Sequence, residues 1–310
     1  MIIYEQNCYI CIMDITTTPI TLFGQEYLVY KGACCSEHSD KRTLYVELTD
    51  TCNAKCPFCS AGRGSTTGSH MVSPDTLKKC VDELVGAGAI DRVSITGGEP
   101  LIVQYTELGR LLDILDNSGV DFYAITTNGR YLAKNLYLLK GHARLRYLNV
   151  SRHHFDDAEN RKIFGDENIP GIADVASMFR ILDEGGRNFR LNCTLGPGVD
   201  MGWIRRYIEA AAHNEISSVL FRHDYFEPHH MEIYKIFNEL LEGRKESTKC
   251  RCMYGYVDWA DMQVEYREVN AGLEHKYERE QQYIRNFVLH ADGSLTGGWS
   301  DDSIKIKREW

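Results

Sequence analysis

From residue 43 onward, short apolar runs alternate with longer amphipathic stretches. The amphipathic stretches have the apolar spacing of helices, and they cover residues 74–85, 105–117, 131–139, 173–184, 202–213 and 229–241. The apolar runs resemble buried strands, and they are TLYVELT (43–49), RVSIT (92–96), FYAIT (122–126), LRYLNVS (145–151), FRLNCTL (189–195) and SVLFR (218–222). Because strands joined through helices pair in parallel with right-handed crossovers, this pattern predicts an α/β fold, a partial (β/α)6 barrel of the TIM type.

Two flanking segments fall outside the repeat and are predicted to be small β-rich attachments. The first contains the candidate strands CYICIMDI, PITLFG and EYLVYKG. In the second, MQVEYREV and NFVLHADGSLTGGW are expected to pair, with Asp292-Gly293 as a tight turn between the last two short strands. The predicted organisation is an N-terminal extension (1–42), a barrel (43–245) and a C-terminal region that covers the substrate (246–310).

Composition limits the class of protein. A chain of 310 residues that is 43% hydrophobic can bury a substantial core. The formal charge of −9 argues against bulk binding of nucleic acid or anionic membrane, although it permits a local basic pocket. No stretch approaches the roughly 20 apolar residues that span a bilayer. Eleven cysteines in a long chain that does not open like a signal peptide indicate a reducing, cytoplasmic location.

Three cysteines lie within eight residues in TCNAKCPFCS (51–60), directly after the first strand of the repeat. Barrel enzymes build their active sites at this C-terminal end of the strands. A structural zinc site normally takes four protein ligands, whereas Cys52, Cys56 and Cys59 are three. A cluster of four irons held by three thiolates leaves one iron open to bind another molecule. Three buried structural thiols are the alternative interpretation.

Polar motifs follow the next strands as well. The second strand ends at Gly97, Gly98, Glu99 and Pro100, where paired glycines permit close approach and Glu99 is an acceptor for an ammonium group. Further strand ends carry side chains that could contact a cofactor or substrate, and these are Thr127, Asn128, Ser151, Arg152, His153, Asn192 and Arg222. For several of them a simple turn, a polar loop or a surface charge is the competing interpretation. By strand alternation, Asn192 should face into the barrel and Cys193 should face the helices.

With its C-x3-C-x2-C loop and GGEP motif, the sequence resembles the radical S-adenosylmethionine (SAM) superfamily from about residue 43 to 225. The resemblance implies that Cys52, Cys56 and Cys59 hold a [4Fe-4S] cluster whose open iron binds the amino and carboxylate groups of SAM. It also implies reductive cleavage of SAM to a 5′-deoxyadenosyl radical that abstracts hydrogen from a substrate, with an electron donor such as flavodoxin or ferredoxin.

The resemblance assigns cofactor contacts to several positions. The GGEP stretch would receive the methionine amino group, and Ser151 would contact the carboxylate or ribose of SAM. Phe58 matches the aromatic residue that the family often carries near the adenine. The remaining predicted cofactor contacts are Thr127, Asn128, Arg152 and Asn192, and His153 and Arg222 are predicted to contact the substrate.

The tail resembles the auxiliary-cluster region, of twitch or SPASM type, in the GTP-cyclising enzyme of molybdenum cofactor synthesis. It departs from that pattern because Gly297, Gly298 and Trp299 stand where a ligating cysteine is expected. Cys250 and Cys252 could return a hydrogen atom to a substrate radical; an inert role or another metal is the alternative.

A second group of cysteines lies in the N-terminal extension, at Cys8, Cys11, Cys34 and Cys35. They could bind zinc or a second metal, with small buried hydrophobes as the alternative.

The predicted function is a radical SAM enzyme that acts on a small molecule such as a nucleotide or sugar. A peptide-modifying maturase that crosslinks or epimerises its substrate is the runner-up. An alternative of another class is a non-catalytic iron–sulfur or zinc sensor or binding module. GGEP together with Ser151 and Arg152 favours the enzyme, because a sensor has no need to cradle an amino acid at its cluster.

Overall fold

The computed structural model describes part of the chain. The described residues are 16–31, 42–59, 70–183, 186–196, 198–223, 236–237, 239, 254–259, 262–267, 283–284, 286–299, 303–308 and 310. The predicted strand CYICIMDI and most of the predicted helix at 229–241 lie outside them.

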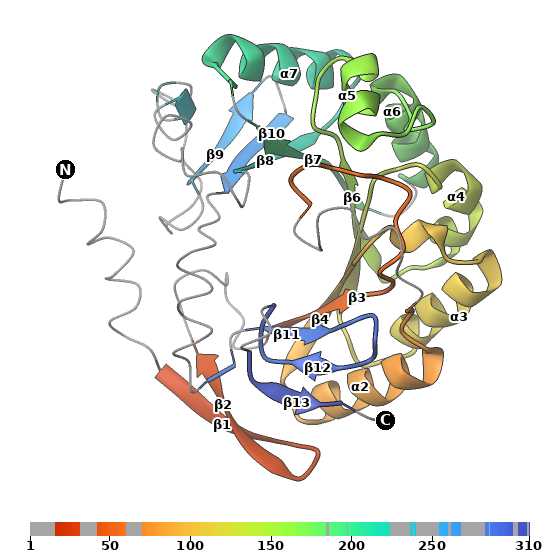
Figure 1. Ribbon diagram of the computed structural model, residues 1–310, viewed down its shortest axis with the longest axis vertical. Helices are drawn as coiled ribbons and strands as arrows, with labels where there is room; N and C mark the ends of the chain where they lie inside the picture. The colour runs from red at the N-terminus through yellow and green to blue at the C-terminus, as the bar shows by residue number, and fades with distance from the viewer. Residues whose placement is uncertain are drawn as a thin grey trace, which may run out of the picture.

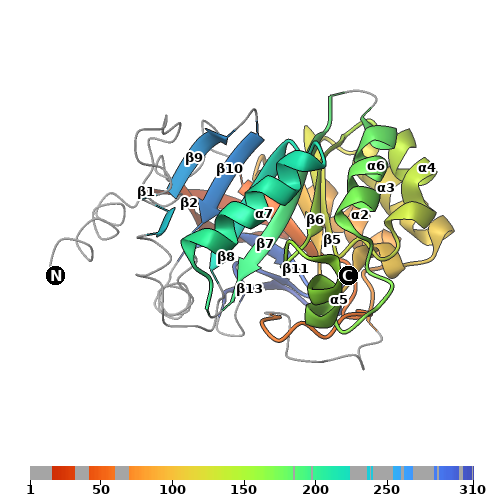
Figure 2. The ribbon, with the colours of Figure 1, turned by 90° about the horizontal axis from the view of Figure 1, so that it is seen from above.

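Six parallel strands, paired in chain order, form the centre of a curved sheet (Figure 1). They are β3 (Arg42–Glu47), β4 (Ile90–Thr96), β5 (Phe122–Thr127), β6 (Leu145–Ser151), β7 (Asn188–Leu195) and β8 (Ser218–His223). Helices cover the outer side of this sheet (Figures 1 and 2). They are α2 (Pro74–Gly86), α3 (Tyr105–Asp116), α4 (Leu132–Gly141), α5 (Asp157–Phe164), α6 (Ile172–Leu182) and α7 (Met201–His213). The predicted partial barrel is confirmed.

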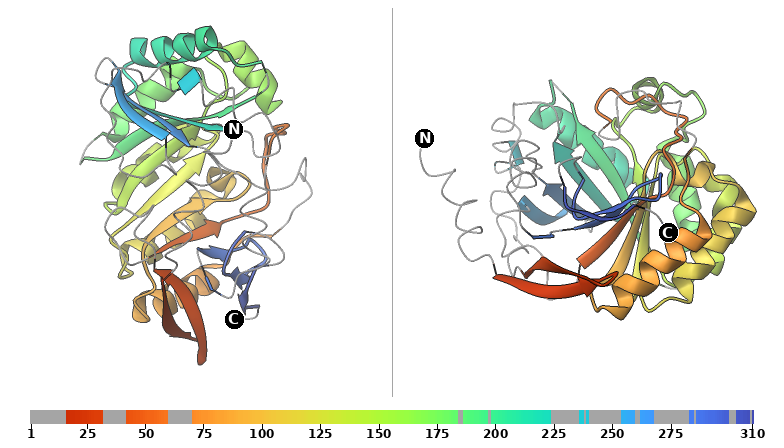
Figure 3. Two further views of the ribbon diagram at one scale, coloured as in Figure 1. Left: turned by 90° about the vertical axis from the view of Figure 1, so that its left-hand side faces the viewer. Right: turned by 60° about the horizontal axis from the view of Figure 1, so that its bottom comes forward.

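The sheet continues past the six strands at both edges (Figure 3). At one edge β11 (Phe287–Leu289) pairs in parallel with β3, and β12 (Leu295–Thr296) and β13 (Lys305–Lys307) follow in antiparallel order. At the other edge β10 (Met262–Arg267) pairs in parallel with β8 and antiparallel with β9 (Tyr254–Trp259). The expected pairing of MQVEYREV with NFVLHADGSLTGGW is therefore wrong. The first segment pairs with β8 at one edge of the barrel sheet, and the second pairs with β3 at the other edge. The turn at Asp292-Gly293 is confirmed, with φ of 88° at Gly293.

Alternation along the strands gives the sheet two different faces. In β3, Leu44 and Val46 are buried in the core with the helices, whereas Thr43, Tyr45 and Glu47 are half-buried on the opposite side. We call that opposite side the concave face. Residues that pair across neighbouring strands point to the same face of a sheet. Glu47 pairs with Thr96, and Ser151 pairs with Asn192, so all four residues belong to the concave face. Polar side chains therefore line the inside of the barrel, and apolar side chains fasten the helices to its outside.

Capping residues mark the start of α2 and both ends of α5. Ser73 accepts a hydrogen bond from the backbone of Thr76 and begins α2 as predicted, with Pro74 in the first turn. Helix α5 was not predicted from the sequence. It is only eight residues long and carries little apolar periodicity, so its signals are the Asp156 cap and the left-handed Gly165 at its end.

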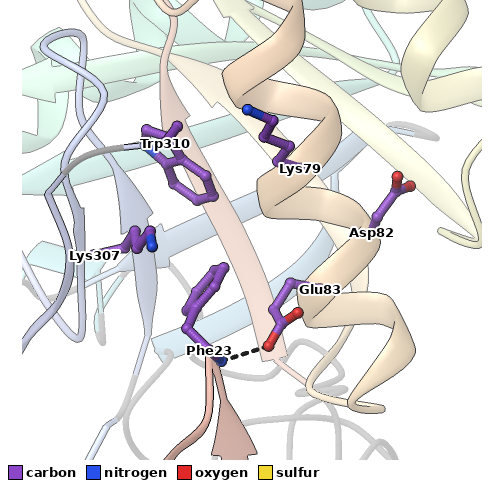
Figure 4. A pocket seen from close by; sticks show the side chains of 6 residues that line it. All are labelled: Phe23, Lys79, Asp82, Glu83, Lys307 and Trp310. Carbon is purple, nitrogen blue, oxygen red and sulfur yellow. Dashed lines mark hydrogen bonds between the residues drawn. The ribbon is translucent and has the colours of Figure 1, made fainter.

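The N-terminal segment forms the predicted hairpin, with β1 (Thr16–Leu22) antiparallel to β2 (Gln25–Lys31). Its turn reaches α2, where the Phe23 amide donates to the Glu83 carboxylate. The Phe23 ring packs edge-on against Trp310, with centroids 5.5 Å apart. Figure 4 shows the surface pocket at this junction, which is lined by Phe23, Lys79, Asp82, Glu83, Lys307 and Trp310. The positive charges of its two lysines equal the negative charges of its two carboxylates. The pocket lies against α2 on the outer side of the sheet, where the hairpin turn, α2 and the C-terminal segment meet (Figure 4).

Strands β10 and β11 belong to the same sheet as the barrel, although the predicted boundary at residue 245 assigns them to a separate C-terminal region. The division into 1–42, 43–245 and 246–310 stays a proposal. In the described portion of the chain, no helix has the length and apolar character needed to cross a bilayer.

Candidate functional site

The three-cysteine loop leaves the C-terminal end of β3. Cys52, Cys56 and Cys59 are all half-buried. Burial raises the pKa of the Cys56 thiol to about 12, and the neighbouring thiols of Cys59 and Cys52 add to this rise. Burial also raises the pKa of Cys52, with smaller contributions that include Cys59. Cys52 and Cys56 pack on the same apolar cluster, and the Cys59 amide donates to the Cys56 carbonyl at 3.2 Å, so the three cysteines share one compact loop. The raised pKa values of Cys52 and Cys56 disfavour free thiolates there, and bound metal ions would compensate the negative charge.

The cysteine loop rests on the segment that follows α5. The Lys55 amide donates to the Phe164 carbonyl at 2.8 Å, and Asn53 Nδ2 donates to Asp166 Oδ2 at 2.8 Å. A small apolar cluster of Ala54, Phe164 and Ile169 packs under Cys52 and Cys56. Neither Asn53 nor Asp166 was identified from the sequence, because their pairing depends on the unpredicted helix α5.

The GGEP loop packs directly against the backbone that leads into the cysteine loop. The Gly98 amide donates to the Thr49 carbonyl at 2.6 Å, and the Glu99 amide donates to the Thr51 carbonyl at 2.8 Å. A Cβ atom at Gly98 would lie 2.1 Å from the Thr51 oxygen, and one at Gly97 would lie 2.5 Å from the Thr49 oxygen. Gly97 also has φ of 119°, which a side chain disfavours. The close approach that these glycines permit is thus to the neighbouring loop of the protein itself.

Glu99 holds the end of β5. Its carboxylate is 1% exposed and accepts hydrogen bonds from the Leu101 amide at 3.0 Å, from Thr127 Oγ1 and from the Asn128 amide at 2.7 Å. Burial raises the pKa of Glu99 to about 7, against the opposing effect of these bonds. Pro100 begins the short 3-10 helix η1 (Pro100–Ile102), which turns the chain away after this contact.

Asn128 links the β5 end to the cysteine loop. Its Nδ2 donates to Asn53 Oδ1 at 3.0 Å and lies 4.0 Å from Cys52 Sγ. The side chains of Thr127 and Asn128 both donate to protein acceptors, Glu99 and Asn53. Their predicted direct contacts with SAM stay predictions. By donating to Glu99 and Asn53, Thr127 and Asn128 connect the end of β5 to the loops that follow β4 and β3.

Ser151 and Asn192 pair across β6 and β7 on the concave face. Asn192 is 5% exposed, and within the described residues its Oδ1 has no hydrogen-bond partner. A buried acceptor of this kind is costly unless a ligand satisfies it. Cys193 faces the other way, as predicted, and is fully buried in the core with the helices.

Arg152 lies on the helix side of the sheet. Its side chain is almost fully buried, and Nη2 donates to the Phe155 carbonyl at 3.0 Å and to the Asp157 carboxylate. Its own carbonyl accepts from the Tyr207 hydroxyl of α7 at 2.9 Å. Its buried Nε and Nη1 have no hydrogen-bond partner among the described residues, so its predicted contact with SAM stays a prediction. The geometry supports a role in fastening the β6 end to α5 and α7.

His153 is buried and hydrogen-bonded through both backbone and side chain. Its amide donates to Asn160 Oδ1 at 2.8 Å, and its Nδ1 accepts from the Thr194 amide at 3.0 Å. Burial, followed by the charges of Arg152 and Arg222, lowers the pKa of His153 to about 3. The Phe58 ring packs edge-on against this imidazole, with centroids 4.6 Å apart. These contacts favour a structural role for His153, and its predicted substrate contact is not supported by them.

The other predicted positions divide into two groups. Arg222 is half-buried and pairs in register with Thr194 on the concave face, so its predicted substrate contact stays a prediction. The remaining cysteines lie outside the described residues, and they are Cys8, Cys11, Cys34, Cys35, Cys250 and Cys252. The predicted zinc or second metal and the predicted hydrogen donors therefore gain no support.

The donor set fits an iron–sulfur cluster. Within the described ranges, no three His, Cys, Asp or Glu side chains converge as the ligands of a single metal ion would. A four-iron cluster binds each thiolate at a different iron, so its three cysteines need not converge on one point. The loop offers three neighbouring thiols, and the buried, unpartnered Asn192 Oδ1 lies on the same concave face.

Comparison with protein families decides the assignment. Residues 46–211, more than half of the chain, match the model described as the radical SAM superfamily. The chain belongs to this superfamily. It is accordingly an enzyme of the radical SAM class, and the family uses a [4Fe-4S] cluster and SAM.

Curated relatives include proteins named GTP 3′,8-cyclase. That of Lactiplantibacillus plantarum is 33% identical over 167 residues, covering 51% of this chain and 48% of the relative. That of Edwardsiella ictaluri is 26% identical over 215 residues, covering 64% of this chain and 63% of the relative. The chain thus spans less than two thirds of the length of these relatives.

Solved structures with the same fold include SuiB of Streptococcus suis bound to S-adenosylmethionine. Its TM-score is 0.59 at 14% identity, covering 83% of this chain and 60% of SuiB. The structure of anSMEcpe with bound AdoMet also gives a TM-score of 0.59 at 14% identity, covering 86% of this chain and 77% of anSMEcpe. Both likenesses concern the partial barrel of radical SAM enzymes.

Replacement of Gly98 by alanine should disrupt the cysteine loop. The new methyl group would collide with the Thr51 carbonyl, so we expect at least roughly 10-fold weaker retention of iron after anaerobic reconstitution. Gly86→Ala is the matched control, because its added Cβ meets nothing within 4 Å. Iron retained per chain against increasing chelator measures the effect, and equal retention in both variants would contradict this account of the loop.

His153 should make the fold sensitive to acid. Its pKa is lower in the folded state than the value near 6.5 in the unfolded chain, so its contribution to stability is complete above pH 6.5 and declines below it. Between pH 6.5 and 4.5 we expect wild type to lose roughly 2 kcal/mol more unfolding free energy than His153→Asn, which keeps an acceptor but does not titrate. Urea unfolding across this range measures the difference, and parallel curves for the two proteins would show that His153 is not buried in its neutral form.

Proposed function

We propose that this enzyme reductively cleaves SAM and abstracts hydrogen from a small organic substrate of the nucleotide or sugar type. When bound, the cluster supplies the electron that cleaves SAM to methionine and a 5′-deoxyadenosyl radical. Cys52, Cys56 and Cys59 would hold the cluster, and the polar strand ends around them would hold SAM. The observation that carries this proposal is the joining of the three-cysteine loop to the GGEP loop by two backbone hydrogen bonds.

Each predicted SAM contact has a specific argument. Glu99 Oε1 accepts two hydrogen bonds and Oε2 accepts one, so Oε2 retains the capacity to accept a hydrogen bond from an ammonium group. Ser151 and Asn192 are neighbours on the concave face, and the Asn192 acceptor lacks a partner among the described residues. Phe58 lies beside the third cysteine, and its ring packs on His153. The backbone of Gly97 and Gly98 completes the proposed binding surface.

A small-molecule substrate has two kinds of support. The relatives named GTP 3′,8-cyclase suggest a nucleotide, although they share only part of their length with this chain. The concave face also carries Arg92, Arg190 and Arg222, which suit an anionic substrate. The chain has no cysteine after Cys252, so a cyclase-like auxiliary cluster in the tail is not proposed.

The alternative predictions fare differently. Membership of the radical SAM class disfavours the non-catalytic sensor or binding module. The peptide-modifying alternative is suggested by the structure of SuiB bound to precursor peptide SuiA, but that likeness, at 14% identity, concerns the fold alone. The cytoplasmic location and the flavodoxin or ferredoxin donor stay predictions.

Cys56→Ala should abolish SAM cleavage. After anaerobic reconstitution and reduction with dithionite, we expect wild type to form 5′-deoxyadenosine and Cys56→Ala to form at least roughly 100-fold less, because a thiolate ligand is lost. Cys80→Ala is the matched control, since Cys80 is a fully buried core residue of α2. Equal formation by all three proteins, or none by wild type even with cell extract as a source of substrate, would reject the proposed chemistry.

A further inference from the structure

An aromatic surface lies on the concave face beside β3. Tyr45 is in the middle of this strand, and its ring contacts Trp299, with centroids 5.2 Å apart and planes inclined at 56°. Trp299 follows β12 and is 38% exposed, which is high for so large an apolar side chain. Because Tyr45 points to the inside of the barrel, the Trp299 ring that touches it lies on the same side. A planar ligand could stack there.

A chain of hydrogen bonds fixes the backbone that carries Trp299. His290 Nδ1 lies 2.5 Å from Glu47 Oε2, and its Nε2 lies 2.9 Å from Thr296 Oγ1. The Thr296 hydroxyl in turn donates to the Gly298 carbonyl at 2.7 Å, one residue before Trp299. The end of β3 therefore holds the Trp299 segment in place, as a preorganised binding surface requires. This arrangement was not visible in the sequence, because residues 47 and 290 meet only through the parallel pairing of β3 with β11.

Cationic side chains lie farther along the same face. Arg92 of β4 is placed over the Phe122 ring, 5.7 Å from its centroid, and forms an ion pair with Asp91. In the register of β3 with β4, Arg92 pairs with Thr43 and Ser94 with Tyr45, so Arg92 and Tyr45 lie on adjacent strands of the same face, one alternation apart.

Arg190 of β7 donates to Asn149 Oδ1 at 3.1 Å and to Glu265 Oε2 at 3.2 Å, while Arg222 lies nearer the end of β8. Two of these three arginines are paired with carboxylates, Arg92 with Asp91 and Arg190 with Glu265, so their guanidinium groups are held in place on this face and offer their remaining N–H groups to an anionic ligand.

We propose that Trp299 and Tyr45 form the subsite for the base of a nucleotide, whose phosphates face the arginines of the concave face. This inference rests on the proposed function and specifies its substrate. A planar ring that carries several negative charges matches the aromatic surface and the arginines together. The subsite is supplied by β3 and by the tail, so the C-terminal region would take part in substrate recognition.

The test uses the reconstituted enzyme with SAM and measures binding of radiolabelled GTP and ATP by equilibrium dialysis. Loss of one stacking partner should raise the Kd of Trp299→Ala by about 10-fold or more, whereas Trp299→Phe should stay within about 3-fold. Trp310→Ala is the matched control, because Trp310 lies at the α2 junction and, among the described residues, reaches the β11–β12 turn only through the Gly293 carbonyl, so its Kd should stay within about 3-fold of wild type. Melting temperatures confirm that each variant is folded.

Fluorescence gives a second measurement on the same proteins. Nucleotide should quench tryptophan emission in wild type and in Trp310→Ala, and this quenching should disappear in Trp299→Phe while binding persists. Equal nucleotide affinity in Trp299→Ala and wild type, or undiminished quenching in Trp299→Phe, would overturn the proposed subsite. So would Trp299-dependent binding of an aromatic tripeptide without any binding of nucleotide. Formation of 5′-deoxyadenosine by wild type is scored separately, so failure of the subsite is distinguishable from failure of the radical chemistry.

Discussion

Two backbone hydrogen bonds between neighbouring strand-end loops determine the geometry of the whole site. Residues 98 and 99 donate to the carbonyls of residues 49 and 51, and this contact is possible only because Gly98 has no Cβ. It sets the path of the chain immediately before the first cysteine. Glu99, placed by the same contact, then holds the end of β5, and Asn128 from that end reaches back to the cysteine loop. The loops at the ends of β3, β4 and β5 are therefore hydrogen-bonded to one another, so we expect a substitution in one loop to displace the other two.

The two faces of the sheet separate stability from chemistry. Apolar side chains directed at the helices form one continuous core, which keeps the strand ends in register. The opposite face is free to carry polar groups such as Asn192 and Arg190, and an aromatic surface at Tyr45. This division explains why Arg152 contacts α5: a shift of one residue from Ser151 moves a side chain to the other face, where Arg152 Nη2 donates to Phe155 and pairs with Asp157.

Much of the fold could be predicted from the sequence, because strand runs and helix caps are local signals. The six parallel strands, the capped helix at Ser73 and the hairpin before residue 31 all follow from such signals. The destinations of β10 and β11 could not be read in this way, since they depend on which edge of the finished sheet is open. Helix α5 was missed because capping residues rather than apolar spacing define it.

The candidate site divides in the same manner. The cysteine spacing and the GGEP string are short motifs that point to their chemistry directly, whereas the contacts of Asn53, Asp166 and His290 join residues far apart in the chain. The burial of His153 likewise depends on packing against Phe58 and Phe164, which the polar string around it does not reveal. Sequence reasoning was thus most successful where one loop carries the chemistry.

The central claim is that the loop of Cys52, Cys56 and Cys59 leaves one iron open for SAM. Electron paramagnetic resonance of the reconstituted, dithionite-reduced protein, recorded with and without SAM, tests it most directly. We expect a reduced [4Fe-4S] signal from a protein with about four irons per chain, and a clear change in its g values when SAM is added. A signal that saturating SAM leaves unchanged, or a protein that assembles no cluster, would contradict it.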